Sequence, residues 1–184
     1  MKVYAIIANG TEEVECLTFV DIMRRAEIDT VLVSVESSRE VVSSHNVKIT
    51  AEYTVEEVDF SDGDILFLPG GMPGAERIAA NKKVMDTVFT YNSLKKRIVA
   101  ICAAPAVVLG RNGLLKGKRA VCYPGLEKEL IGSTLTLKGV VTDDNITTAI
   151  GLGYALNLAL DIVDKVKGVE YGYKLRDAIQ YKFN

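Results

Sequence analysis

The sequence predicts an α/β fold in which helices cover both faces of a mostly parallel central sheet. Short, mostly apolar runs at residues 3–8, 30–35, 64–68 and 98–101 alternate with longer segments of helical periodicity. Apolar runs of this length are typical of strands buried on both faces. Strands separated by helices form parallel sheets, whose functional sites lie at the carboxyl ends of the strands. We expect a single domain over residues 1–184.

The remaining elements follow from local signals. Thr11 is expected to cap a helix that runs to about Ala26. Residues 36–63 are more polar and predict a hairpin or short edge strands around 47–50 and 53–55. Further helices are expected at residues 82–94, after Cys102 as far as Gly113, at 151–167 and at 170–181. Later strands are expected at residues 120–123, 140–143 and 146–148.

Composition excludes several classes of protein. The chain has 184 residues, is 48% hydrophobic and carries a formal net charge of −2, so no basic field exists to gather nucleic-acid phosphates. The apolar run at residues 3–8 is too short for a signal peptide, and no run reaches membrane-spanning length. Three cysteines at unrelated spacings form neither a disulfide framework nor a zinc motif. We therefore expect a cytoplasmic protein without a membrane or nucleic-acid partner.

The chemistry of the chain centres on Cys102. The run at residues 98–101 delivers this cysteine to a strand-to-helix corner, and Pro105 suits the first turn of the helix that follows. Unpaired N–H groups and the helix dipole favour an anion at such a corner. The position therefore predicts a thiol with a lowered pKa and a reactive thiolate. A small buried hydrophobic residue is the alternative interpretation, and the corner position favours reactivity.

A glycine-rich loop, Gly70–Gly74, follows the strand at residues 64–68. It lacks the glycine spacing of nucleotide-binding loops, and a tight turn is its simplest role. Glycines also let backbone N–H groups approach a ligand oxygen closely. We expect the amides of Gly71 and Ala103 to form an oxyanion hole. A second glycine turn, Gly151–Gly153, is interpreted as structural.

Glu15 is the second candidate catalytic residue. It shares a helical row with Phe19, Ile22 and Ala26, so its carboxyl group is expected on the core side of the helix. Burial raises the pKa of a carboxyl group. A protonated Glu15 would donate a hydrogen bond to a thiolate or relay protons. The alternative is an acidic side chain near a helix start that reaches solvent.

Five segments together resemble the ThiJ/PfpI superfamily, in its DJ-one branch. They are Asn-Gly-Thr-Glu-Glu-Val-Glu at residues 9–15, Val-Asp-Ile-Met-Arg-Arg-Ala at 20–26, Leu-Pro-Gly-Gly at 68–71, Ala-Ile-Cys-Ala-Ala-Pro at 100–105, and Tyr123-Pro124. The resemblance covers almost the whole chain. It implies a flavodoxin-like three-layer α/β/α sandwich, the fold of class I glutamine amidotransferases, and a homodimer.

The resemblance also implies roles for individual residues. The glutamate that matches Glu15 is protonated and hydrogen-bonds the cysteine that matches Cys102. Backbone N–H groups come from the residues that match Gly71 and Ala103. Functions reported for the family are cofactor-free conversion of methylglyoxal to lactate, removal of early glycation adducts, peroxide sensing and chaperone-like activity.

Two functions follow as hypotheses. One is glyoxalase or protein-deglycase activity on small reactive carbonyls, with no cofactor and no metal. The alternative is a peroxide-sensing redox or chaperone-like protein that acts through oxidation of Cys102. Peptidases of the superfamily have a histidine directly after the nucleophile, where this chain has Ala103, so we do not expect a peptidase. The glutamine amidotransferase relatives need a late histidine that this chain lacks.

The chain departs from its relatives at Tyr123, which matches a histidine in members with glyoxalase activity. A tyrosine hydroxyl is a poor base at neutral pH but a serviceable hydrogen-bond donor. His45 is the only histidine, and it aligns with an arginine near the reactive cysteine of a relative. We expect either a solvated side chain or a partial replacement for the missing base. Cys16 and Cys122 are interpreted as core residues.

Overall fold

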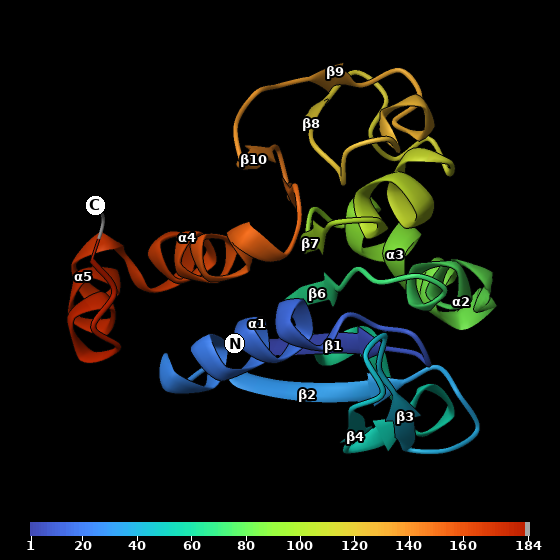
Figure 1. Ribbon diagram of the computed structural model, residues 1–184, viewed down its shortest axis with the longest axis horizontal. Coiled ribbons are helices and arrows are strands. Elements are labelled where there is room, and N and C mark those ends of the chain that lie inside the picture. Colours follow the sequence, from blue (N-terminus) through green and yellow to red (C-terminus); the bar gives the residue numbers. More distant parts are fainter. Residues whose placement is uncertain (183–184) are drawn as a thin grey trace.

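A seven-stranded sheet forms the centre of the molecule, in the strand order β10–β11–β7–β6–β1–β2–β5 (Figure 1). The computed structural model describes residues 1–182. Every neighbouring pair in this sheet is parallel except β10 with β11. The strands of the sheet are β1 (Lys2–Ile7), β2 (Asp29–Ser34), β5 (Tyr53–Thr54), β6 (Ile65–Leu68), β7 (Arg97–Ile101), β10 (Val140–Asp143) and β11 (Ile146–Ala149). Two short ribbons pair β3 (Glu40–Val42) with β4 (Lys48–Thr50), and β8 (Arg119–Ala120) with β9 (Thr134–Leu135).

The helices form two groups. The α-helices are α1 (Glu13–Arg25), α2 (Gly74–Ala80), α3 (Lys82–Ser93), α4 (Ala155–Lys167) and α5 (Val169–Ala178). Helix α4 contacts both α1 and α5, whereas α2 contacts α3 and the π-helix η3 (Pro105–Gly110). In Figure 1, α4 and α5 lie together at one end of the view, and α2 and α3 at the other. No helix within residues 1–182 is both long and apolar enough to cross a membrane.

Alternation along the strands fills two apolar clusters. Phe67 of β6 stacks on Phe19 of α1, with ring centroids 3.9 Å apart. Its neighbours Leu66 and Leu68 belong to the opposite cluster, which contains Tyr91 of α3. Successive strand residues point to opposite faces, so helices on both sides must cover this sheet. The structure thus confirms the predicted three-layer α/β/α sandwich.

Two predicted elements are corrected, and one helix was not predicted. The strand expected at residues 120–123 is only β8 (Arg119–Ala120), and Tyr123 lies in a loop. The helix expected after Cys102 is the π-helix η3, which ends at Gly110. Helix α2 (Gly74–Ala80) was not expected, because its glycine start resembles a turn.

The start of α1 also differs from the prediction. Glu12, not Thr11, is the N-cap residue, and its Oε2 accepts a hydrogen bond from the Glu15 amide at 2.6 Å. Thr11 instead accepts a hydrogen bond from the Ala8 amide at 2.9 Å. Thr11 therefore fixes the end of β1, and the helix begins one residue later than expected.

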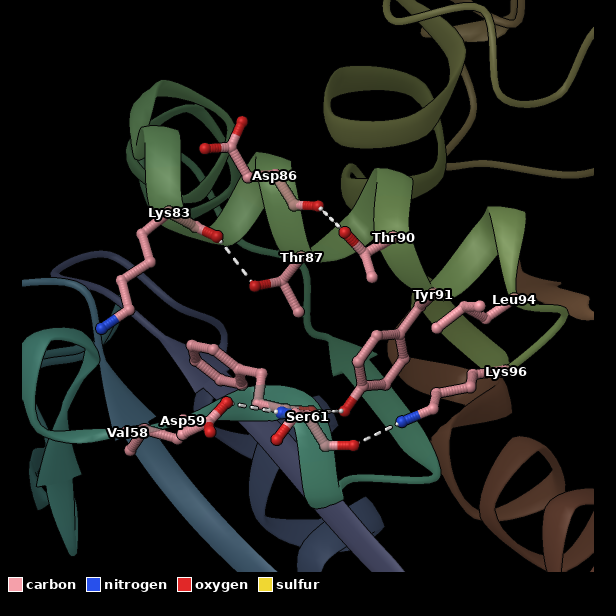
Figure 2. Close-up of a pocket in the computed structure, with 11 residues that line it drawn as sticks. Val58, Asp59, Ser61, Lys83, Asp86, Thr87, Thr90, Tyr91, Leu94 and Lys96 are labelled. Atoms are coloured by element: carbon pink, nitrogen blue, oxygen red, sulfur yellow. Dashed lines mark hydrogen bonds between the residues drawn. The ribbon is translucent and has the colours of Figure 1, made fainter.

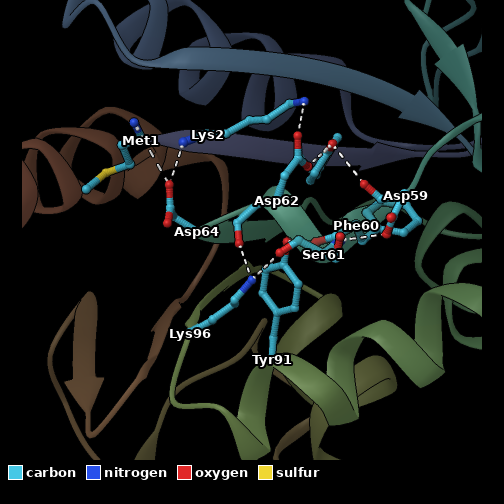
Figure 3. A network of polar contacts seen from close by, with 11 residues as sticks. Met1, Lys2, Asp59, Phe60, Ser61, Asp62, Asp64, Tyr91 and Lys96 are labelled. Carbon is cyan, nitrogen blue, oxygen red and sulfur yellow. Dashed lines mark hydrogen bonds and ion pairs between the residues drawn. The ribbon is translucent and has the colours of Figure 1, made fainter.

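Polar contacts fix the loop that leads into β6 (Figure 3). Lys96 donates to the carbonyl oxygen of Ser61 at 2.7 Å, and the Tyr91 hydroxyl donates to that of Phe60 at 2.8 Å. These bonds satisfy carbonyl groups that have no partner in the sheet. They hold the amino end of the strand whose carboxyl end carries the glycine-rich loop.

Candidate active site around Cys102

Cys102 lies directly after the carboxyl end of β7, at a sharp turn. Its backbone adopts a left-handed conformation, with φ of 66°, which is strained for a residue that carries a side chain. Two hydrogen bonds hold it there: the Cys102 amide donates to the Ala149 carbonyl at 3.0 Å, and the Tyr123 amide donates to the Cys102 carbonyl at 2.7 Å. The turn brings the half-buried sulfur to the carboxyl-terminal ends of the parallel strands, just before η3 begins at Pro105.

Glu15 contacts this sulfur from the first turn of α1. Its side chain is buried, and its carboxylate accepts hydrogen bonds from the Gly70 amide at 3.1 Å, from the Leu152 amide and from the Cys102 thiol. Burial, helped by the negative charge of Glu12, raises the pKa of Glu15 to about 7, although the hydrogen bonds act to lower it. The predicted position on the core side of α1 is therefore the one observed.

The thiol does not ionise readily by itself. Burial, followed by repulsion from an ionised Glu15, raises the pKa of Cys102 to about 12. The amides of Gly71 and Ala103 donate to the sulfur and act to lower this pKa, but burial outweighs them. The prediction of a lowered thiol pKa from the helix corner alone was wrong. Two buried acids in contact favour at most one negative charge, and a thiolate forms beside Glu15 when Glu15 holds the proton.

Gly70 is the point at which these groups meet. A Cβ atom on this residue would lie 2.5 Å from both Cys102 Cβ and Glu15 Oε2, and 3.0 Å from Cys102 Sγ. Contacts this short do not occur between real side chains, so only glycine lets the carboxyl group and the sulfur share the site. The glycine also leaves its amide free to bind Glu15.

Tyr123 flanks the site through Gly151. A Cβ atom on Gly151 would lie 3.4 Å from Tyr123 Cδ2 and 3.8 Å from Glu15 Oε1. The aromatic ring and the carboxyl group thus both lie close to Gly151. Tyr123 is 53% exposed, so this flank of the site is open to solvent.

His45 lies elsewhere. Its ring contacts Glu13, Glu12 and Ser44, and the part of the chain that the structure describes shows no bond between it and Cys102. The role of a replacement base at the sulfur therefore finds no support in the geometry.

The other two cysteines are buried, as expected. Burial raises the pKa of Cys16 to about 12 and that of Cys122 to about 11. Neither sulfur is as accessible as that of Cys102, which remains the candidate nucleophile.

The sequence did not predict that the amides of Gly70 and Leu152 donate hydrogen bonds to Glu15. The second lies in the turn Gly151–Gly153, which was interpreted as structural. The available signal was its position just after a short β-strand at residues 146–148, because strand ends of a parallel sheet converge on one edge.

A separate cavity of about 330 Å³ lies between α3 and the loop before β6 (Figure 2). Its lining includes Phe60, Lys83, Thr87, Tyr91 and Lys96. These residues lie beside the amino ends of β6 and β7, whereas the sulfur follows the carboxyl end of β7. This cavity is therefore not part of the site around Cys102.

Comparison with known proteins agrees with the geometry. The DJ-1/PfpI family profile matches residues 1–165. The chain belongs to the DJ-1/PfpI family. This result confirms the resemblance inferred from the five sequence segments.

Relatives in the family span plants, animals and protists. DJ-1 homolog B of Arabidopsis thaliana is 37% identical over 94% of this chain, but the chain spans only 39% of that protein. Protein dj-1beta of Drosophila melanogaster is 31% identical, with coverage of 97% of this chain and 96% of its own length. A solved structure of oxidized Toxoplasma gondii DJ-1 superposes with a TM-score of 0.95 at 32% identity, covering 99% of each chain.

Gly70→Ala should disable the thiol. The added methyl group must displace Cys102 or Glu15, so we expect the rate of alkylation by iodoacetamide to fall by about tenfold or more, since a kcal/mol-scale clash alters rates on this order. Gly153→Ala is the matched control, because a Cβ atom there has no neighbour within 4 Å. Equal alkylation rates in both variants would contradict the crowding at Gly70.

Glu15→Gln should change how stability depends on pH. The folded chain keeps a proton on Glu15 up to about pH 7, whereas the unfolded chain loses it near 4.5. Stability therefore falls as pH rises between these values, by up to about 3 kcal/mol for a shift of this size. Urea unfolding at pH 5 and pH 8 should show this loss in the wild type but not in Glu15→Gln.

The exposed variant Glu56→Gln serves as the control for that experiment and should behave like the wild type. An identical loss of stability in Glu15→Gln would show that the buried carboxyl group is not its source.

Proposed function

We propose that this chain is a cysteine-dependent enzyme that acts on small reactive carbonyl compounds such as methylglyoxal, or on glycation adducts derived from them. The observation that carries the proposal is the buried Glu15 carboxyl group, with its pKa raised to about 7, hydrogen-bonded to the Cys102 thiol. Such a pair can generate a thiolate and return its proton within one site.

The first step is addition of sulfur to the aldehyde. Glu15 carboxylate takes the proton from Cys102, and the thiolate forms a C–S bond with the aldehyde carbon while the C=O π electrons move to oxygen. The amides of Gly71 and Ala103, which donate to the sulfur in the free protein, follow the negative charge to that oxygen. Glu15 then protonates it, which gives a hemithioacetal.

The second step moves hydrogen between adjacent carbons. Glu15 removes the proton from the former aldehyde carbon and the neighbouring ketone carbon receives one, so the first carbon is oxidised and the second reduced. The product is a lactate thioester, and water hydrolyses it to lactate and free Cys102. The net reaction adds one water to methylglyoxal and needs no external redox agent. In this proposal Tyr123 orients the second oxygen by donating its hydroxyl hydrogen, which its position beside Gly151 supports.

A second function is favoured by one contrast among the cysteines. Cys102 is half-buried, whereas Cys16 and Cys122 are buried, so peroxide reaches the Cys102 sulfur first. Attack of the thiolate on peroxide breaks the O–O bond, gives sulfenic acid and releases water; a second peroxide yields sulfinic acid. Glu15 and the two amides would then hydrogen-bond the oxidised sulfur. The homodimer that the family resemblance implies and the cytoplasmic location expected from the composition remain predictions.

Incubation with methylglyoxal and a lactate assay test the enzyme. We expect lactate from the wild type, a loss of about a hundredfold or more in Cys102→Ser, and a higher turnover in Tyr123→His, because imidazole is a better base at neutral pH. Absence of lactate at high wild-type concentration would overturn the carbonyl chemistry.

Peptide mapping after graded peroxide then decides the second function, which requires oxidation of Cys102 before Cys16 and Cys122.

A further inference from the structure

The turn between β3 and β4 folds over the start of α1. The Ser44 amide donates to the Thr11 carbonyl at 2.9 Å, and the Gly10 amide donates to the Val42 carbonyl at 2.8 Å. These two backbone bonds anchor the β3 side of the turn, directly before His45, and bring His45 to the two acidic residues at the helix start. The placement therefore comes from the fold and not from a flexible side chain alone.

Three ligand-type atoms converge at this place. His45 Nδ1 lies 3.1 Å from Glu13 Oε1 and 3.8 Å from Glu12 Oε1. One atom from each of the three side chains lies within 4.8 Å of the other two. Ligands bound tetrahedrally at about 2.0–2.1 Å from a zinc ion lie roughly 3.3 Å from one another, so only small movements are needed.

Glu12 supplies an independent observation. Its side chain is only 10% exposed, and its Oε2 is used to cap the Glu15 amide. The other oxygen, Oε1, is fully buried and accepts no hydrogen bond from any residue that the structure describes. A buried carboxylate oxygen without a partner is costly, and this one is aimed at the imidazole nitrogen at a distance too long for a hydrogen bond. A cation between them would satisfy it.

Charge supports the same conclusion. Two carboxylates and an imidazole together match the charge and the ligand preference of a divalent transition metal. The His45 side chain is 72% exposed, so a fourth coordination position would face solvent.

We propose that Glu12, Glu13 and His45 bind a divalent transition metal ion of the zinc type. None of the three proposed ligands contacts the sulfur, although Glu12 is next to Glu15 in space and acts on its pKa. The metal proposal holds whether or not the proposed carbonyl reaction is correct. The sequence predicted no metal, because the two acidic residues and the histidine come from different segments and meet only when the hairpin docks on α1.

Titration of the untagged chain with Zn²⁺ in a calorimeter tests the site. We expect one ion per chain with a dissociation constant well below millimolar, and a loss of more than about tenfold in His45→Ala, since even outer-shell changes cost this much. His45 is exposed, so this variant should fold; Glu13→Gln is the second variant and should show a similar loss. Glu56→Gln and Cys102→Ser are controls that should bind as the wild type does.

Co²⁺ provides a spectroscopic readout of the ligands. A site built from carboxylates and imidazole gives weak visible bands and no sulfur-to-metal charge-transfer band. Unchanged binding in His45→Ala, a charge-transfer band that disappears in Cys102→Ser, or no binding at millimolar Zn²⁺ would each overturn the proposal.

Discussion

The close approach of Glu15 and Cys102 across Gly70 is the constraint on which the rest of the site depends. The carboxyl group comes from the first turn of α1, the sulfur from the end of β7, and the glycine from the loop after β6. Parallel pairing of β6 with β7 sets these ends side by side, and a single Cβ at Gly70 would separate them. The fold therefore holds the Glu15 carboxyl group and the Cys102 thiol in contact with Gly70.

Burial makes those two acids compete for one proton. Either group alone would pay the cost of a charge in a poorly solvated place, and both charges together would add repulsion. Backbone amides reduce that cost from two sides: Gly70 and Leu152 act on the carboxylate, and Gly71 and Ala103 act on the sulfur. Carbonyl chemistry and peroxide chemistry both start from the same shared proton, which explains why one site fits two hypotheses.

The sequence predicted what depends on local pattern, namely the apolar strands, the core-side position of Glu15 and the corner that carries Cys102. It could not predict quantities that depend on three-dimensional burial. The corner amides suggested a lowered thiol pKa, but desolvation around the folded sulfur exceeds their effect. The sequence also could not predict that His45 contacts Glu12 and Glu13, because these contacts depend on how the β3–β4 hairpin docks on α1. Tyr123 was placed in a strand, whereas its backbone is held in a loop by the carbonyl of Cys102.

The most direct measurement is a ¹³C NMR titration of the Glu15 carboxyl carbon, assigned by its absence in Glu15→Gln. The structure predicts a midpoint near pH 7, far above the ordinary value of 4.5. Replacement of Cys102 by serine should move that midpoint, because the thiol hydrogen bond to the carboxylate is then exchanged for a hydroxyl bond. A midpoint near 4.5 that is unaffected by the cysteine would contradict the shared proton.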